Sequence, residues 1–552
     1  MSTKRIRLAA MAGFAAAAIT LTACTGTAAP EENTGDGGAT IDEAHSVGAM
    51  EDFAADVTFK ASEPVDFSLM YRDHPNYPVQ DDWSIFTHLE DDHNVTFSRT
   101  DIPLADFDQK KSLLIGGGEA TDIISVTYSG QETQFVSGGA ILPVSDYFEY
   151  MPNFQKKIEE WGLADELDNR KQEDGKIYLL PGLREVPDVQ YSVMIRDDLW
   201  QSAGITEDPA TWDEFAEQLA EVKAANPELQ YGLSDRWTDQ TPLGALLNVM
   251  APNYDTTAGW GYQNTYYDRD AEEFVFSGAT EEYQELISYA AGLVEDGLLD
   301  PEITQTDDQA IQKFISGQSA AISGNTQALS EYRTKLADAG KGDIPIRLIS
   351  VPGGPAGSNL AAGRFTSGIM IGSEAAEQPY FKALLQFVDW LYYSDEGLEF
   401  ALLGVEGETF ETASDGARSL LPDVNWSSIN PDAPKKLNAD FGYSNGVFSL
   451  ANGSSAALTQ SMMTPEIADW TAAQLEAKEV LPVAPVAPLS EMELEQTTLL
   501  QTQLTDAVRT ATAAFITGQR SIDDDWDAYV QEMQGLGSDQ LIETVNAALE
   551  RG

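Results

Sequence analysis

Apolar and polar positions along the first part of the chain form short units with two alternating periods. Val65–Met70 alternates residue by residue, which predicts a half-buried strand, and Thr121–Val126 is a second predicted strand. Phe107–Ile115 lies between them and has helical spacing. Strands and helices that alternate in short units predict an α/β domain with a mainly parallel sheet.

The middle and the end of the chain carry helical patterns. A capping box at Thr211–Glu214 precedes apolar residues on one helix face, and another apolar stripe runs over Phe381–Leu391. The tryptophans that lie on such stripes are expected in hydrophobic cores: Trp200, Trp212, Trp390 and Trp526. A chain of 552 residues exceeds the usual size of one core, which predicts two or more lobes.

The charge balance is strongly acidic. Asp and Glu number 90 against 32 Lys and Arg, which gives a formal net charge of −58. Such a chain repels phosphates, which argues against nucleic-acid binding. For the same reason we do not expect electrostatic binding to an anionic membrane surface. A solubilising role explains the acidity without any partner.

The amino terminus has the organisation of an export signal. Lys4, Arg5 and Arg7 precede the apolar segment Leu8–Ile19, and small residues follow in Leu21–Cys24. A charged start, a short apolar stretch and small residues before a cleavage point are typical of secretory signals, and the stretch is too short for a membrane-spanning helix.

The only cysteine of the chain lies at the end of this signal. Leu21–Cys24 resembles the bacterial lipobox, which implies cleavage after residue 23 and attachment of diacylglycerol to Cys24. We therefore expect residues 1–23 to be a lipoprotein signal peptide and the protein to be lipid-anchored on the extracellular face of the cell membrane. Residues 24–61 are rich in small and acidic residues, which predicts a flexible tether.

Catalytic motifs are scarce. The four histidines lie at positions 45, 74, 88 and 93, so most of the chain lacks the commonest general base and metal ligand. Gly442–Gly446 matches Gly-x-Ser-x-Gly, but no histidine follows it, which favours a loop over a nucleophile elbow. Asp268, Asp270 and Glu272 favour a polar hairpin tip over a calcium loop. We expect no enzyme activity, no metal and no cofactor, although a glycosidase with two carboxylates stays open.

Several segments, in order along residues 62–552, resemble the extracellular solute-binding proteins of bacterial ABC importers, in particular the large lipoproteins that bind carbohydrates. The segments that carry the resemblance are Leu113–Ile124, Asp174–Pro181, Ile195–Trp200, Pro209–Phe215, Glu295–Glu302, Phe314–Ala321, Asp389–Gly397, Gly404–Phe410, Phe515–Gly518 and Trp526–Tyr529. Two departures stand out. No calcium loop is found, and Gly324-Asn325-Thr326 stands where many relatives have Gly-Asn-Trp.

The resemblance implies an α/β, two-lobed fold of the periplasmic-binding-protein type (type II), closing over its ligand about two or three crossing segments. The N-terminal lobe is expected in residues 62–187 plus 366–430, and the C-terminal lobe in 188–365 plus 431–552. It also implies an oligosaccharide ligand, ABC-transporter permease subunits as partners and a monomeric chain.

Candidate ligand contacts are polar and aromatic side chains in loops, because sugars present C–H faces to aromatic rings and hydroxyls to polar groups. Those selected are Tyr71, Asp73, Tyr128, Trp237, Trp260, Tyr262, Asn325, Phe365, Glu406 and Tyr443. The leading hypothesis is capture of a neutral oligosaccharide for import. The alternatives are a peptide receptor of an ABC importer and a secreted glycoside hydrolase.

Overall fold

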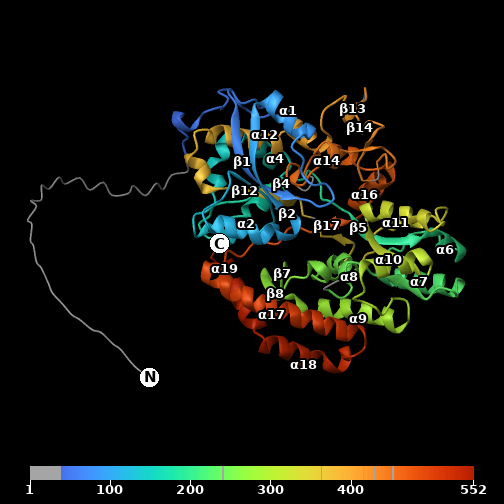
Figure 1. Cartoon of the computed structure of the whole chain (residues 1–552). Coiled ribbons are helices and arrows are strands. Elements are labelled where there is room, and N and C mark those ends of the chain that lie inside the picture. The colour runs from blue at the N-terminus through green and yellow to red at the C-terminus, as the bar shows by residue number, and fades with distance from the viewer. Residues whose placement is uncertain are drawn as a thin grey trace, which may run out of the picture. The chain divides into compact units, whose positions relative to one another are not determined.

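The computed structural model describes residues 39–551 except 239–240, 362, 415, 428 and 451–452 (Figure 1). The expected signal peptide, Cys24 and the first part of the expected tether lie outside the described residues. Within the described ranges, no helix is both long enough and apolar enough to cross a bilayer.

The first lobe is built on a five-stranded sheet of order β2-β1-β3-β12-β4. Its strands are β1 (Val65–Asp73), β2 (Val95–Pro103), β3 (Ile123–Thr127), β4 (Leu180–Leu183) and β12 (Phe365–Ile371). β1 pairs in parallel with β2 and β3, whereas β12 runs antiparallel to both of its neighbours. The helices around this sheet include α1 (Ser84–His93), α2 (Phe107–Gly116), α4 (Pro152–Glu160), α12 (Phe381–Tyr393) and α13 (Asp395–Leu403).

The second lobe contains a four-stranded sheet of order β10-β5-β9-β6. Its strands are β5 (Tyr191–Arg196), β6 (Tyr231–Ser234), β9 (Ser319–Asn325) and β10 (Ile346–Leu348). The elements around it include α7 (Trp212–Ala225), α8 (Gly244–Met250), α9 (Glu281–Glu295), α10 (Asp307–Ser316), α11 (Thr326–Asp338), α17 (Glu491–Ile516), α18 (Ile522–Gly535) and α19 (Ser538–Leu549). All four tryptophans expected in cores are buried.

Three chain segments pass between the lobes. Residues 184–190 join β4 to β5, and residues 361–364 join β11 (Asn359–Leu360) to β12. The third passage follows α15 (Ala456–Ser461), because Leu458 packs in the first core whereas Ile467 packs with second-lobe residues.

The third passage lies later in the chain than the expected boundary at residue 431. Residues between 437 and 458 contribute to the first core, among them Tyr443, Phe448 and Leu458. Tyr443 lies edge-on to Phe400 of α13, with ring centroids 5.4 Å apart. The local pattern of this segment does not reveal which lobe supplies these aromatic partners.

The second part of the expected tether, residues 39–61, packs on the first lobe. Phe59 and Ala61 are fully buried, and the Phe59 ring contacts Phe387 of α12 at 5.8 Å between centroids. The backbone N–H of Met50 donates to the side-chain carbonyl of Gln386 at 2.8 Å. The aromatic and apolar residues of this segment give it enough surface to bury, unlike the small residues before it.

A buried carboxylate links two helices of the first lobe. Asp389 of α12 accepts hydrogen bonds from the backbone N–H groups of Asn153 and Phe154 and from the Asn153 side-chain amide, at 2.8–2.9 Å. These donors are at the start of α4, where unpaired N–H groups favour a carboxylate. Burial nevertheless raises the pKa of Asp389 to about 7.

This pKa makes stability depend on pH. An unfolded aspartate has a pKa of about 4. Between pH ~4 and ~7 the folded chain therefore keeps a proton on Asp389 that the unfolded chain has released. The free energy of unfolding is therefore expected to fall by about 1 kcal/mol per pH unit for this group as pH rises through that window. Chemical denaturation at several pH values measures the slope. Asp389→Asn is expected to reduce it, Asp91→Asn on the exposed surface to leave it unchanged, and equal slopes in all three proteins would contradict the assignment.

Candidate ligand-binding site

The strand ends that carry functional side chains lie at one edge of each sheet. In the first sheet, β1 and β3 end at this edge and the antiparallel β12 begins there with Phe365. In the second sheet, Tyr191 begins β5 opposite Asn325, which ends β9. The passage 184–190 leads directly from Leu183, opposite Phe365 in the first sheet, to Tyr191 in the second, so both edges border the space between the lobes. Ligands of open α/β sheets bind beyond such edges.

Three aromatic rings form a cluster at the edge of the second sheet. Trp260 lies edge-on to Trp237 at 5.6 Å and to Tyr191 at 5.1 Å between ring centroids. Trp237 and Tyr191 are also edge-on, at 5.9 Å. Trp260 is 36% exposed and Tyr191 37% exposed, although both are large hydrophobic residues. We call Tyr191, Trp237 and Trp260 the aromatic triad.

Trp237 is fixed in an uncommon backbone conformation. Its φ angle is +58°, in the left-handed region that bulky residues rarely adopt. The Asp307 carboxylate accepts from the Trp237 backbone N–H at 2.7 Å and from the Arg236 guanidinium at 3.1 Å. The same guanidinium lies 4.1 Å from the centre of the Trp237 ring. Strained residues held by several surrounding contacts occur preferentially at functional sites.

A buried acid supports the loop that carries Trp237. Asp235 accepts hydrogen bonds from the Ser323 hydroxyl of β9 and from the backbone N–H of Leu246 in α8, the latter at 3.1 Å. Its second carboxylate oxygen is buried and makes no hydrogen bond to the described residues. Burial raises the pKa of Asp235 to about 7. Asp235 thus links the end of β6, two residues before Trp237, to β9 and α8.

The edge of the first sheet contributes aromatic and basic groups. Tyr128, immediately after β3, is 49% exposed, and Arg170 lies 5.5 Å from the centre of the Phe365 ring. Arg170 also donates to the Ser129 hydroxyl. The guanidinium of Arg72, near the end of β1, makes no hydrogen bond or ion pair with any described residue. Guanidinium groups at this edge can donate hydrogen bonds to ligand oxygens.

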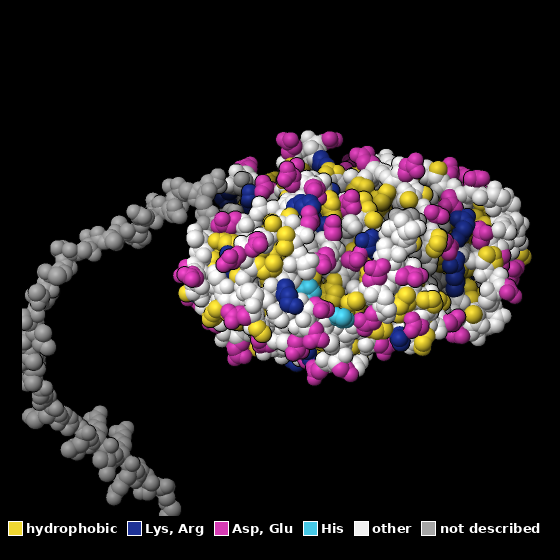
Figure 2. Space-filling view, turned by 90° about the horizontal axis from the view of Figure 1, so that it is seen from above, with side chains coloured by type: hydrophobic (Ala, Val, Ile, Leu, Met, Phe, Trp, Pro, Cys, Tyr) yellow, Lys and Arg dark blue, Asp and Glu magenta, His cyan; other side chains and the backbone are white. Residues whose placement is uncertain are grey.

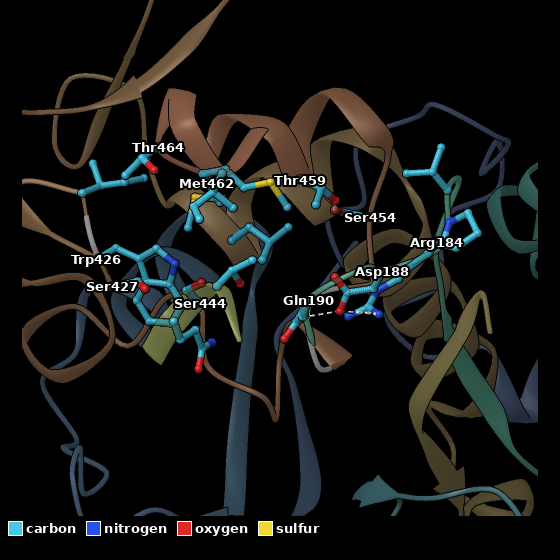
Figure 3. Close-up of a pocket in the computed structure, with 18 residues that line it drawn as sticks. Arg184, Asp188, Gln190, Trp426, Ser427, Ser444, Ser454, Thr459, Met462 and Thr464 are labelled. Carbon is cyan, nitrogen blue, oxygen red and sulfur yellow. Dashed lines mark hydrogen bonds and ion pairs between the residues drawn. The ribbon is translucent and has the colours of Figure 1, made fainter. Parts of the chain in front are cut away.

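A small pocket lies between the passages themselves (Figure 3). Asp188 lies between Arg184 and Gln190, accepting from Arg184 at 2.8 Å and from the Gln190 amide. Ser444 and Thr459 line other walls. Its volume is about 120 Å³, well below the roughly 300–1,000 Å³ typical of small-molecule sites. The pocket is therefore too small for an oligosaccharide, and the surface around the aromatic triad is the better candidate.

Comparison with known families agrees with this geometry. The sequence profile of the family described as bacterial extracellular solute-binding protein matches residues 76–396, more than half of the chain. The chain belongs to this family.

Relatives of this solute-binding protein extend the comparison. A Brucella abortus (strain 2308) protein, named only as a binding protein, is 23% identical over 292 residues, covering 53% of this chain and 63% of the relative. The match thus spans less than two thirds of that relative. The structure of alginate-binding protein AlgQ2 without calcium is 18% identical with a TM-score of 0.65, covering 90% of this chain and 99% of that one. S. pneumoniae FusA in complex with kestose is 18% identical with a TM-score of 0.62, covering 88% and 99%. These structures confirm the two-lobed α/β fold.

Of the residues predicted to contact a ligand of this solute-binding protein, two lie against each other in the structure. Three others lie apart from one another at the sheet edges that border the space between the lobes. Trp237 and Trp260 are in the aromatic triad, whereas Asn325, Tyr128 and Phe365 lie at the sheet edges. Asn325 has a structural task, because its side chain accepts from the backbone N–H of Ala328 at 2.8 Å and caps α11.

Two of the predicted tyrosines are buried inside the protein, and a third, Tyr262, is half-buried. Tyr71 is 1% exposed and its hydroxyl accepts from the Asn445 amide at 2.7 Å. Tyr443 is fully buried in the first core. The Tyr262 hydroxyl lies 3.3 Å from the Asn264 side-chain oxygen, in the part of the second lobe covered by α17.

The two acidic residues predicted to contact ligand each accept a hydrogen bond from a backbone N–H six residues later in the chain. Asp73 accepts from the backbone N–H of Val79 at 2.8 Å, and the exposed Glu406 accepts from that of Thr412 at 3.2 Å. Tyr191, Arg72 and Arg170 are candidates that the sequence did not single out. Tyr191 follows a Pro-containing passage, a local signal that could have drawn attention to it.

Proposed function

We propose that this protein captures an oligosaccharide outside the cell and delivers it, chemically unchanged, to the permease subunits of an ABC importer. The observation that carries the proposal is the aromatic triad, in which rings lie partly exposed at a strand edge between the lobes. Aromatic faces bind the C–H surfaces of sugars, and neighbouring polar groups bind their hydroxyls.

Solved relatives support a carbohydrate over other solutes. Among the chains of the same fold are an alginate-binding protein, FusA with kestose, and a solute-binding protein of Bifidobacterium longum infantis described as binding HMO. These ligands differ from one another, so they indicate the chemical class and leave the particular sugar open.

The expected lipid anchor supports the location. Attachment of diacylglycerol to Cys24 would hold the protein at the extracellular face of the membrane, beside its permease. Ligand contacts to both lobes would stabilise a closed state, and the permease would respond to that state.

Calorimetry against oligosaccharide and peptide panels tests the proposal. We expect saturable binding of at least one oligosaccharide with a Kd of about 1 μM or tighter. Mass spectrometry of the recovered sugar is expected to show it intact. Binding of peptides alone would contradict the proposed ligand class, and shortened sugar products would indicate a glycoside hydrolase.

A further inference from the structure

One exposed face of α17 is lined with polar side chains at helical spacing. Glu495, Thr498, Thr502, Thr505 and Arg509 follow one another at intervals of three and four residues, which places them on one side of the helix. From Glu495 to Arg509 this face is about 21 Å long, at about 1.5 Å per residue. We call these five residues the α17 stripe.

A different face of α17 anchors the helix in the second lobe. Leu504, Val508, Ala511 and Phe515 are buried in the second core. The α17 stripe is therefore on a helix whose orientation is fixed by packing, as a binding surface requires. Figure 1 shows α17 beside the hairpin of β7 (Thr265–Asp268) and β8 (Glu273–Phe276).

Two cavities lie along the stripe. The larger, of about 860 Å³, lies between the first half of α17 and the first lobe, and its lining includes Gln134, Gln172, Tyr178, Glu495, Thr498 and Leu499. The smaller, of about 450 Å³, has residues 262–265 on one side and Thr498, Thr502, Thr505 and Arg509 of α17 on the other. Thr498 lines both, so the two cavities adjoin.

The lining has groups that remain available to a ligand. The guanidinium of Arg509, which lines the smaller cavity, makes no hydrogen bond or ion pair with any described residue, so its terminal N–H groups can donate to a ligand. The Thr498 hydroxyl donates to the Leu494 carbonyl at 2.7 Å, which leaves its oxygen free to accept. Leu499 is 72% exposed and supplies an apolar surface beside these polar groups. Hydroxyls, amides and a limited apolar surface suit a sugar chain.

The smaller cavity connects the stripe to the aromatic triad. Residues 262–265, which line the cavity, begin two positions after Trp260 in the chain. The Asn264 side-chain amide holds this segment on α17 by donating to the Gln501 carbonyl at 3.0 Å and to the Thr505 hydroxyl at 2.8 Å. The short segment of residues 260–265 therefore links the aromatic triad to the α17 stripe within the second lobe.

We propose that the α17 stripe is a second binding subsite, which holds the distal sugar units of a long linear oligosaccharide whose near end stacks on the aromatic triad. This inference rests on the proposed oligosaccharide function and adds to it a preference for chain length. A short sugar occupies the triad alone, whereas a longer one also contacts α17 and binds more tightly.

Thr498→Trp tests the subsite by filling the point where the cavities meet. The control is Gln503→Trp, because Gln503 is exposed on the same helix and about 140° around it from Thr498. Each protein is equilibrated with a mixture of linear oligosaccharides from disaccharides to decasaccharides, prepared from starch, xylan, inulin and alginate. Retained sugars are sized by mass spectrometry, and circular dichroism verifies folding.

We expect the unmodified protein and the control to retain long chains preferentially. Thr498→Trp is expected to lower retention of the long chains about tenfold while leaving short chains within about twofold. The same length profile in all three proteins would overturn the subsite while the proposed function stands. Equal losses for short and long chains would also overturn it, because they would indicate an effect on lobe closure. Retention of no sugar by the unmodified protein would reject the proposed function and this inference with it.

Discussion

Trp260→Ala is expected to weaken oligosaccharide binding by about 1–3 kcal/mol, roughly a 5- to 150-fold rise in Kd. Trp260 contacts both other rings of the aromatic triad, so its removal opens the centre of the proposed stacking surface. Because the ring is 36% exposed, its loss leaves little unfilled core, and the free energy of unfolding should change far less than the affinity.

Calorimetry with the sugar identified in the binding panel measures this effect. Trp260→Phe keeps an aromatic face and is expected to recover part of the affinity. Tyr267→Ala removes a half-buried ring from β7 and is expected to leave Kd within about twofold. An unchanged Kd for Trp260→Ala would remove Trp260 from the site.

Arg236→Ala is expected to lower the free energy of unfolding by about 2–3 kcal/mol and to weaken binding as well. The Arg236 side chain is buried and donates to Asp307 and Glu331, both at 3.1 Å, and to the Tyr332 hydroxyl at 2.8 Å. Its loss removes one hydrogen bond from each of these acceptors, although Asp307 keeps its bond from the Trp237 N–H and both carboxylates are partly exposed and can be rehydrated, which limits the cost. It also removes the cation that covers the Trp237 ring.

Separate measurements distinguish stability from positioning. Denaturant unfolding gives the stability change, while near-ultraviolet circular dichroism and Kd report the orientation of Trp237. Arg236→Lys keeps the charge without the planar fork and should recover stability better than ring orientation. Arg333→Ala removes an ion pair whose members are each nearly half exposed, and is expected to cost less than about 1 kcal/mol. Unchanged ring signals in Arg236→Ala would contradict its positioning role.

The fold could be predicted from the sequence because its elements have local causes. The alternation of Val65–Met70 reflects a strand with one buried face. Thr211 begins α7 as expected by accepting from the Glu214 backbone N–H, although the Glu214 carboxylate accepts from Ala210 and does not complete the predicted capping box. The predicted lobe boundary at residue 431 lies too early, since the chain passes to the second lobe only after Leu458. Which lobe a segment joins depends on packing partners that are far away in the sequence. No local feature of Tyr443 indicates that it packs on Phe400.

The contrast between local patterns and distant packing partners also explains which site residues could be predicted. Trp237 and Trp260 were identified as aromatic residues in Gly- and Asp-containing loops, and the structure places them together. Tyr71 has a similar setting in the sequence, yet a hydrogen bond to Asn445, 374 residues away, occupies its hydroxyl inside the protein. Tyr191 was missed because a tyrosine at the start of a strand resembles any other strand residue. Whether a loop aromatic faces solvent depends on chain segments far from it in the sequence.

The packing of residues 39–61 decides which half of the molecule would be held still by an anchor. Phe59 and Met50 fasten this segment to α12, so a force applied at the amino-terminal end is borne by the first lobe. Within the part of the chain that the structure describes, three passages connect the second lobe to the first, and the second lobe carries both the aromatic triad and the α17 stripe. If the lobes close over a ligand, the second lobe would therefore move relative to the anchored first lobe.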